Sequence, residues 1–373
     1  MTFSFKTFKT LKEAVSTVTK TEFIDAMTSV YDSGDERLVR SIMELGTDIQ
    51  IADVLKRVFA TKLPKAESGA EERLAAEIKK LGISPEKKLE LAYAIEDGSA
   101  FDIVGLMNKS VAKPAPISSC VNTSVAGAPD LLQWFVGWNA KADAGTRGKA
   151  ATEIFIIAAG KNGRTPDKGD CIVDGITIES KSLGTGFGGE FSISGKQSSF
   201  IEPVTSFKNG LANLFNSKKI KVANEEEYGL GGAKRSGVLT GTHGKSLVTA
   251  LQNTIDILKN EGKMSDKQID AALQKLIVDA FPAASGLSLS VVSGGQIDAH
   301  NFMILWNAAA FAEYKFEEGF DVAMFFNRKA MSVITFKTPQ DIIKMKDKIK
   351  PMNISYNVGI GQNKSIGGFE IKA

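Results

Sequence analysis

The sequence is poor in cysteine and histidine. Its 373 residues include two cysteines, Cys120 and Cys171, and two histidines, His243 and His300. The cysteines lie far apart and have no Cys or His neighbour at metal-ligand spacing, which argues against a disulfide scaffold and against a structural zinc site. Reactions that need a histidine base have few candidates, and no serine or cysteine has a base partner for acyl transfer.

Long apolar runs are also missing. Residues 1–10 alternate Phe with Thr, Ser and Lys and lack the apolar stretch of a secretory signal. The most apolar segment, residues 301–312, is too short to cross a bilayer and contains Asn307. We therefore expect a soluble, cytoplasmic protein with no membrane partner.

The charges of the two signs almost cancel. Lysine and arginine number 46 and aspartate and glutamate 43, so the net charge is +3, and 43% of the residues are hydrophobic. This composition is typical of globular proteins, and the length predicts two or three domains. The balance excludes a highly basic protein that coats DNA, but a local basic groove depends on distribution and stays open.

Residues 1–115 carry apolar residues at helical spacing, and we predict an α-helical N-terminal domain there. The pattern predicts helices that begin at Thr21, Asp35 and Asp48, helices over 71–81 and 85–95, and a short one over 99–107. A helical bundle of this kind serves packing or contacts with other proteins. Residues 113–130 are rich in Pro, Ser, Ala and Gly and are interpreted as a linker.

After the linker, helical and strand patterns mix. Helices are predicted over 130–142, 148–159, 245–260, 266–280, 299–316 and 339–348, and strands over 171–173, 176–181, 191–194, 320–326 and 331–336. We expect an α/β domain over 116–345, with a mixed central sheet flanked by helices. A C-terminal β-type extension is predicted over 346–373.

The most informative segment is PDKGDCIVDGITIESKS, residues 166–182. Asp174-Gly175 is a strong signal for a two-residue hairpin turn. Glu179 and Lys181 occupy alternate positions of the second strand, so their side chains point to the same side. Asp170, at the start of the first strand, is nearly as far from the turn as Glu179. The pattern therefore predicts two carboxylates and one ammonium on one sheet face.

This grouping suits a hard divalent cation. Mg²⁺ prefers carboxylate oxygens and keeps several waters. A cation of this kind polarises a phosphodiester and lowers the pKa of a bound water. Lys181 is suited to stabilise developing negative charge or to orient that water. None of these roles needs a histidine.

These residues resemble the PD-(D/E)XK nucleases, which have a restriction-endonuclease-like core. Asp170 matches the Asp at a strand start, and Glu179 and Lys181 match the Glu-x-Lys of the adjacent strand. Glu153, in a predicted helix upstream, matches a Glu that many members carry. The resemblance covers roughly residues 130–200, the motif core.

The resemblance implies Mg²⁺- or Mn²⁺-dependent cleavage of DNA phosphodiester bonds. It implies that Asp170, Glu179 and Glu153 bind the metal and that Lys181 assists the attacking water. The organisation is also similar to that of phage-encoded proteins bearing this core. Expected partners are then DNA and virion proteins bound through the N-terminal helices, in the host cytoplasm or in the virion.

Each residue also has a plainer interpretation. Glu179 and Lys181 can form an exposed cross-strand ion pair, Asp170 can be a turn residue, and Glu153 can be an ordinary helix residue. Asp167 supplies the literal Pro-Asp, but Asp170 directly precedes the apolar strand and is preferred. A second Glu-x-Lys, residues 370–372, has no upstream Asp hairpin.

The function also has alternatives. The fold can belong to a virion structural or assembly protein with weak or no catalysis, or to a nucleic-acid-binding module without turnover, since fold does not dictate function.

Two weaker features follow the motif. Lys196-Gln197 stands where core nucleases place an auxiliary polar residue. Residues 207–246 carry an excess of lysine among glycines, which fits a phosphate-contacting flap or a solvated loop. Residues 241–246 echo the end of a P-loop, but Leu239 stands where the motif needs a glycine, so we set nucleotide hydrolysis aside.

Overall fold

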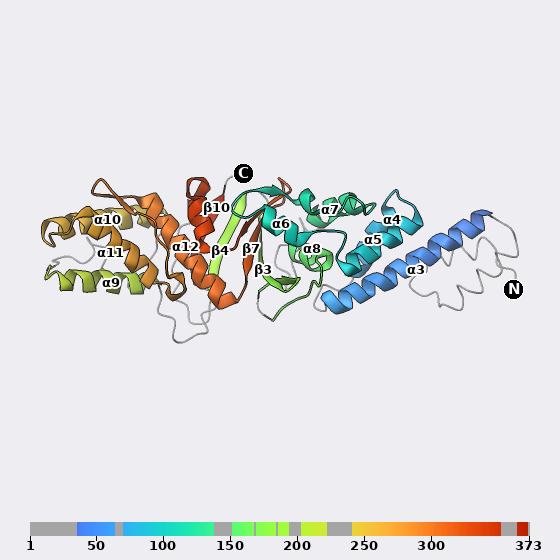
Figure 1. Cartoon of the computed structure of the whole chain (residues 1–373), viewed down its shortest axis with the longest axis horizontal. Helices are drawn as coiled ribbons and strands as arrows, with labels where there is room; N and C mark the ends of the chain where they lie inside the picture. Colours follow the sequence, from blue (N-terminus) through green and yellow to red (C-terminus); the bar gives the residue numbers. More distant parts are fainter. Residues whose placement is uncertain are drawn as a thin grey trace. The chain divides into compact units, whose positions relative to one another are not determined.

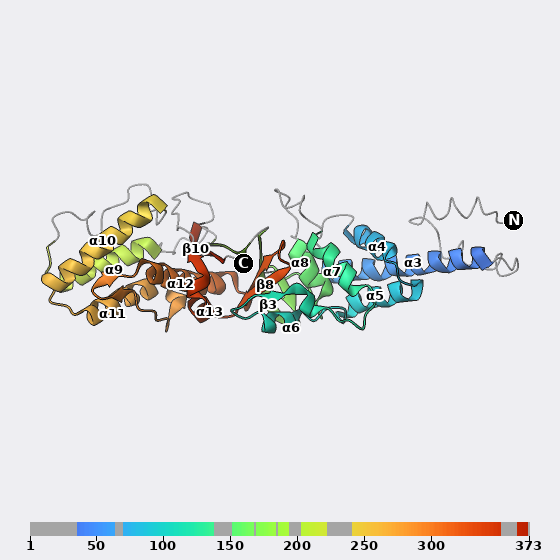
Figure 2. The same cartoon turned by 90° about the horizontal axis from the view of Figure 1, so that it is seen from above.

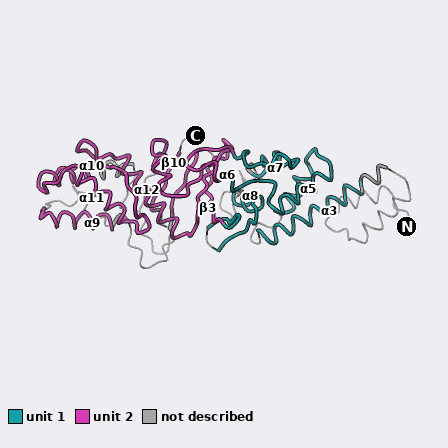
Figure 3. Tube along the Cα trace, in the orientation of Figure 1, with its two compact units in different colours: residues 1–106, 117–175 teal, residues 107–116, 176–373 magenta. Residues whose placement is uncertain are grey.

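The computed structural model describes residues 36–63, 70–137, 151–167, 169–183, 186–193, 203–221, 241–351 and 364–371. The chain forms two compact units (Figure 3). The first contains residues 1–106 and 117–175, and the second contains residues 107–116 and 176–373. This division differs from the predicted boundaries at 115/116 and 345/346. The chain passes into the second unit for ten residues and then returns to the first.

Helices make up most of the first unit. They are α3 (Glu36–Lys62), α4 (Ala70–Lys80), α5 (Pro85–Asp97), α7 (Ala128–Gly137) and α8 (Ala151–Ala159), while α6 (Ile103–Lys109) leads into the second unit. The predicted break at Asp48 is wrong, because α3 is continuous there. Leu45, Ile51 and Leu55 form one buried stripe across that point, and burial of the stripe outweighs the capping preference of Asp48.

An aromatic cluster and a buried lysine hold the first unit together. Phe155 lies 5.5 Å from both Phe101 and Phe135 between ring centroids. Lys62, only 8% exposed, donates hydrogen bonds from Nζ to backbone oxygens at the ends of two other helices. These acceptors are Ile95 O (3.0 Å), Ala158 O (3.3 Å) and Gly160 O (3.3 Å). Burial lowers the pKa of Lys62, and the three carbonyls compensate its charge.

The predicted turn is present. Strand β2 (Cys171–Val173) ends the first unit and is followed by Asp174 at φ 50° and Gly175 at φ 83°. Two successive positive φ values are what a type I′ turn requires. Strand β3 (Ile176–Leu183) then opens the long part of the second unit.

The second unit contains a mixed sheet, as expected. Four of its strands lie in the order β1 (Ala115–Pro116), β8 (Ser332–Phe336), β7 (Val322–Asn327) and β3. Strand β3 pairs in parallel with β7, and β7 pairs antiparallel with β8. Strand β7 is buried along its whole length, so both of its faces are covered, as is usual for strands that pair in parallel.

A second sheet has the order β4 (Phe187–Ile193), β10 (Lys364–Ile371) and β9 (Ile349–Pro351). The described strands of the predicted C-terminal extension, β9 and β10, therefore belong to this sheet, where β10 pairs with β4, a strand that comes much earlier in the chain. A short pair, β5 (Val292–Ser293) and β6 (Gln296–Ile297), lies between helices.

Five helices belong to the described part of the second unit. They are α9 (Pro203–Ser217), α10 (Gly241–Asn260), α11 (Asp266–Asp279), α12 (Ala299–Glu318) and α13 (Pro339–Lys344). The unit also contains two single helical turns, η3 (Pro282–Ala284) and η4 (Lys346–Lys348), and a third, η1 (Ile117–Cys120), lies in the first unit. Helix α9 corrects the interpretation of residues 207–217 as part of a flap. Phe207, Leu211 and Phe215 form a buried helical stripe there.

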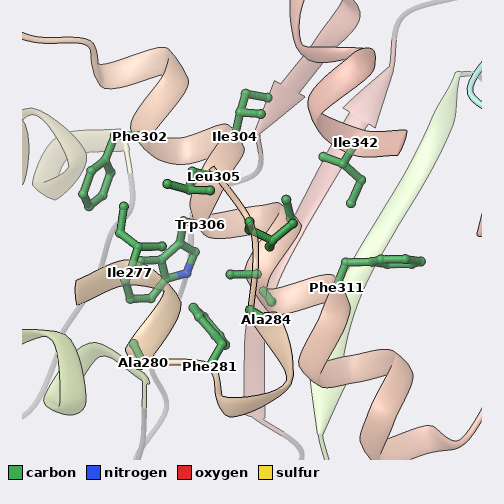
Figure 4. Close-up of a cluster of buried hydrophobic side chains, with 14 of the residues drawn as sticks. Ile277, Ala280, Phe281, Ala284, Phe302, Ile304, Leu305, Trp306, Phe311 and Ile342 are labelled. Carbon is green, nitrogen blue, oxygen red and sulfur yellow. The ribbon is translucent and has the colours of Figure 1, made fainter. Parts of the chain in front are cut away.

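Helix α12 is the centre of the core. It runs between α11 on one side and strands β4 and β10 on the other (Figures 1 and 2). Trp306, 1% exposed, packs among Phe281, Phe302 and Ile277 (Figure 4). A helix that is apolar on almost every side needs such complete cover. Among the described helices, none combines the length and the apolar character that a membrane span requires.

Helix α12 approaches strand β10 closely at a pair of glycines. Asn307, fully buried, accepts a hydrogen bond from Gly368 N at 2.6 Å and donates one to Met303 O at 2.8 Å. A Cβ at Gly367 would lie 2.8 Å from Ala310 Cβ and 3.0 Å from Asn307 Oδ1. The absence of a side chain at Gly367 therefore sets the distance between helix and strand.

Replacing Gly367 by alanine should destabilise the protein by about 1–3 kcal/mol, because the added methyl group overpacks the contact with α12. Urea unfolding measures the change. Gly82→Ala is the matched control, since a Cβ at Gly82 meets nothing within 4 Å. Its free energy of unfolding should change by less than about 0.5 kcal/mol. Equal effects of both substitutions would contradict the packing argument.

Candidate active site

Glu179 and Lys181 form an ion pair on strand β3 of the mixed sheet. Lys181 Nζ lies 2.8 Å from Glu179 Oε1, and the exposed fractions of the Lys181 and Glu179 side chains are 28% and 6%. The predicted placement on one side of the strand is confirmed. The plainer interpretation of an exposed pair is wrong for Glu179, because its carboxylate is buried. A buried charge of this kind must be compensated by its neighbours.

Tyr314, on α12, completes the group. Its hydroxyl donates a hydrogen bond to Glu179 Oε1 at 2.5 Å and accepts one from Lys181 Nζ at 2.9 Å. Both lone pairs of Oε1 are therefore engaged. Among the described residues, none donates a hydrogen bond to the other oxygen, Oε2. One oxygen of this carboxylate is engaged by Tyr314 and Lys181, and the other keeps capacity for a ligand.

The ring of Tyr314 is fixed by aromatic neighbours. Phe191, on β4, stacks on it at 5.5 Å between centroids, and Phe320 meets it at 5.4 Å. The sequence interpretation missed Tyr314, which is only 5% exposed. A usable signal was present, because a tyrosine in an otherwise apolar helix needs a buried partner for its hydroxyl.

Strand β4 leaves room for Lys181. A Cβ on Gly189 would lie 3.3 Å from both Cγ and Cδ of Lys181. The stem of the lysine therefore passes over a glycine and reaches Glu179 and Tyr314. A glycine inside a strand often marks such a close approach, so Gly188-Gly189 was a second signal in the sequence.

The register of β3 against β7 is fixed just before Glu179. Thr177 N donates to Asp321 Oδ2 and Asp321 N donates to Thr177 O, both at 2.8 Å. Lys315 Nζ donates to Asp321 O at 2.5 Å and to Lys337 O at 2.7 Å. Burial lowers the pKa of Lys315. Helix α12, through Lys315, and strand β3 are therefore tied to the start of β7.

Glu313 precedes Tyr314 on α12 and is equally buried, with 4% exposed. Its Oε2 accepts a hydrogen bond from Ala283 N at 3.0 Å, at the turn η3. Burial raises the pKa of Glu313, and this effect exceeds the lowering by the Ala283 hydrogen bond. Three successive side chains of α12 thus anchor it by polar contacts.

The other two predicted site residues belong to the first unit. Asp170 directly precedes β2 and is half-buried. Glu153 lies in the first turn of α8, and its backbone oxygen accepts a hydrogen bond from Cys171 Sγ at 3.7 Å. Asp167 is exposed. The structure brings Glu179 and Lys181 together, while the convergence of Asp170 and Glu153 with them stays a prediction.

Glu179 meets part of what a divalent cation needs. Glu179 offers one carboxylate oxygen, and Mg²⁺ sites commonly use one or two carboxylates with waters. Within the described segments, no three His, Cys, Asp or Glu side chains form a group that could hold a metal ion. Lys196 and Gln197, predicted as auxiliary residues, lie outside the described residues.

Comparisons with known proteins add no further constraint. No protein-family model, no curated protein and no solved structure matches the chain. The interpretation of the site therefore depends on the geometry of its residues and on the resemblance of the motif.

Tyr314→Phe should lower the free energy of unfolding by about 1.5–3 kcal/mol, because it removes a hydrogen bond to a buried carboxylate. In a Glu179→Gln background the same change should cost clearly less, with a coupling free energy of at least about 0.5 kcal/mol. Urea unfolding of the four proteins measures this cycle. Tyr93→Phe, at a half-exposed tyrosine on α5, is the control and should change little. Additive effects of the two site substitutions would contradict the shared contact.

Glu313→Gln should make stability less sensitive to pH. Since burial raises the pKa of Glu313 above its ordinary value of 4.5, its favourable contribution is present below pH 4.5. That contribution is lost as the pH rises through the folded-state pKa. The variant should gain stability relative to the wild type between pH 4.5 and 8, in unfolding measurements across this range. Glu261→Gln, at an exposed position, should follow the wild type, and parallel curves for all three proteins would refute the assignment.

Proposed function

We propose that the protein is a Mg²⁺-dependent nuclease that hydrolyses DNA phosphodiester bonds. The observation that carries the proposal is the buried Glu179, whose Oε1 is held by Lys181 and Tyr314 while Oε2 accepts no hydrogen bond from the described residues. A carboxylate oriented in this way, with an ammonium beside it, suits a cation and the anion that the cation recruits.

Each residue has a role in this proposal. Asp170 and Glu179, with Glu153, hold the cation. When bound, Mg²⁺ or Mn²⁺ polarises the phosphodiester and lowers the pKa of a water. Lys181 orients that water or stabilises the charge that develops on the phosphate. Tyr314 accepts a hydrogen bond from Lys181 and keeps its Nζ beside Glu179.

The same geometry explains why a lysine is useful at position 181. The side chain of Lys181 is 28% exposed, whereas Glu179 is almost fully covered. In this proposal the ammonium contacts the bound phosphate while the stem stays packed against Gly189. Methionine at this position would fill similar space without a charge, which separates packing from electrostatics in an experiment.

Purified protein should cleave supercoiled and linear DNA with Mg²⁺ or Mn²⁺ and not with EDTA. Glu179→Gln and Lys181→Met should each lower the rate by about 10²-fold or more, the usual effect of losing a group that acts in proton transfer or on developing charge. Asp170→Asn and Glu153→Gln test the predicted convergence in the same assay. Glu370→Gln is the matched control, because Glu370 belongs to the second Glu-x-Lys and is exposed on β10.

The outcomes separate the alternatives. Metal-dependent cleavage that is lost at Glu179 and Lys181 but kept at Glu370 supports the nuclease and its site. No cleavage by folded wild-type protein, across DNA forms and metals, favours a virion structural or assembly role. Cleavage that persists in both site variants places the active site elsewhere.

A further inference from the structure

A cluster of lysines lies at one end of the helices of the second unit. Helices α9 and α10 end there and α11 begins there (Figures 1 and 2). Ile220, which is 6% exposed, lies between the two turns and belongs to the same core cluster as Leu258. A Cβ on Gly262 would lie 3.3 Å from Ile220 Cδ1, so the turns approach closely. We call this region the lysine tip; its exposed lysines are Lys218, Lys219, Lys221, Lys263 and Lys267.

The described part of the tip carries little compensating negative charge. Within the described residues 216–221 and 258–268, the acidic side chains are Glu261 and Asp266. Asp266 is already paired with a sixth lysine, Lys259, at 2.7 Å. Like charges gathered in this way repel one another and oppose folding. The arrangement therefore has a cost that the ion pair at Asp266 does not remove.

Backbone conformation adds a second cost. Lys219 has φ 57° and Lys263 has φ 53°, so both lie in the left-handed region just after a helix. Glycine or asparagine is usual at this position, because a Cβ costs roughly 1 kcal/mol there. Two lysines at such positions, in neighbouring turns, point to a function for their side chains.

Helix dipoles do not account for the cluster. A lysine at the C-terminal end of a helix, such as Lys218, is favoured by the dipole. Lys267, however, lies in the first turn of α11, where the dipole disfavours a cation. The lysines come from both N-terminal and C-terminal ends of helices, and what they share is their location at the tip.

The side chains of the tip favour a nucleic-acid backbone over a protein as its partner. Protein interfaces are centred on buried aromatic or arginine anchors, and the exposed large hydrophobic residues of the described chain, Met43, Tyr93 and Phe316, belong to α3, α5 and α12. Contacts to a nucleic-acid backbone need only cations. Lysine, a point charge on a flexible stem, suits phosphates rather than the bidentate contacts that read bases.

We propose that the lysine tip binds the phosphate backbone of DNA without sequence preference. It would act as an anchor apart from the Glu179–Lys181–Tyr314 group. The inference rests on the proposed function only in naming DNA as the polyanion, and it requires no cleavage.

The test compares two variants of the full-length chain that remove the same charge. In one, Lys218, Lys219, Lys221 and Lys263 of the tip are changed to glutamine. In the other, four exposed lysines of the first unit are changed to glutamine: Lys56, Lys80, Lys87 and Lys161. Binding to two duplexes of about 30 base pairs and unrelated sequence is measured by fluorescence anisotropy, in EDTA, at about 50–300 mM salt. Far-ultraviolet circular dichroism and thermal unfolding check that both variants fold.

The tip variant should bind both duplexes at least about 10-fold more weakly at about 100 mM salt. The slope of log K against log salt should become shallower by up to about 3.6, or about 0.9 for each phosphate that the variant no longer neutralises. The control variant should stay within about twofold of the wild type. Equal weakening in both variants, unchanged binding by the tip variant, or no binding by the wild type would each overturn the proposal.

Poly-glutamate separates an acidic protein from DNA as partner. If the tip variant loses affinity for labelled poly-glutamate but keeps its affinity for DNA, the proposal is wrong and the tip binds acidic protein. The cleavage assay tests the proposed nuclease activity separately from DNA binding by the tip. If the wild-type protein binds DNA through the tip but does not cleave it, the proposed binding site is supported and the proposed nuclease activity is contradicted. If the wild-type protein cleaves DNA and the tip variant binds DNA as strongly as the wild type, the nuclease is supported and the binding site at the tip is contradicted.

Discussion

The burial of one carboxylate constrains most of the second unit. Glu179, on strand β3 of the mixed sheet, is almost fully covered, and a charge in that position is tolerated only with close, well-directed partners. Lys181 comes from the same strand, but Tyr314 comes from α12, far along the chain. The helix must therefore keep one fixed position over the sheet. Any slip of α12 or of β3 would leave the charge without its partners.

That position is secured at two points along α12. Near the middle of the helix, Asn307 and the paired glycines of β10 allow a close approach. At its C-terminal end, Lys315 ties the helix to Asp321, which also sets the register of β3. Between these points most of the buried side chains of the helix are apolar. Apolar burial supplies the cohesion here, while the few polar contacts choose one arrangement among many of similar burial.

Local patterns were enough to predict many elements. Strand β2, the start of β3, the turn at Asp174-Gly175 and the long apolar helix α12 follow from alternation, from turn chemistry and from helical spacing. The placement of Glu179 and Lys181 on the same side of β3 also follows from alternation.

The continuous α3 was missed, because a capping signal at Asp48 is weak beside a buried stripe that only tertiary packing makes visible. Helix α9 was missed because Lys208 and Gly210 obscured the stripe of Phe207, Leu211 and Phe215. Tyr314 could not be assigned to Glu179 from sequence, since their contact joins positions 135 residues apart. The division into units was hidden for the same reason, because it depends on which distant segments pair.

The excursion of residues 107–116 into the second unit has a consequence for synthesis of the chain. Ala115 pairs with Val333, and Ser110 Oγ lies 2.7 Å from Thr335 Oγ1. These partners emerge about 220 residues later, which at ribosomal rates of about 5–20 residues per second means a delay of roughly 10–45 s. During that interval the short edge strand has no ladder to join, although the helices before it can already form. A nascent chain therefore presents an unpaired strand edge of the kind that chaperones protect.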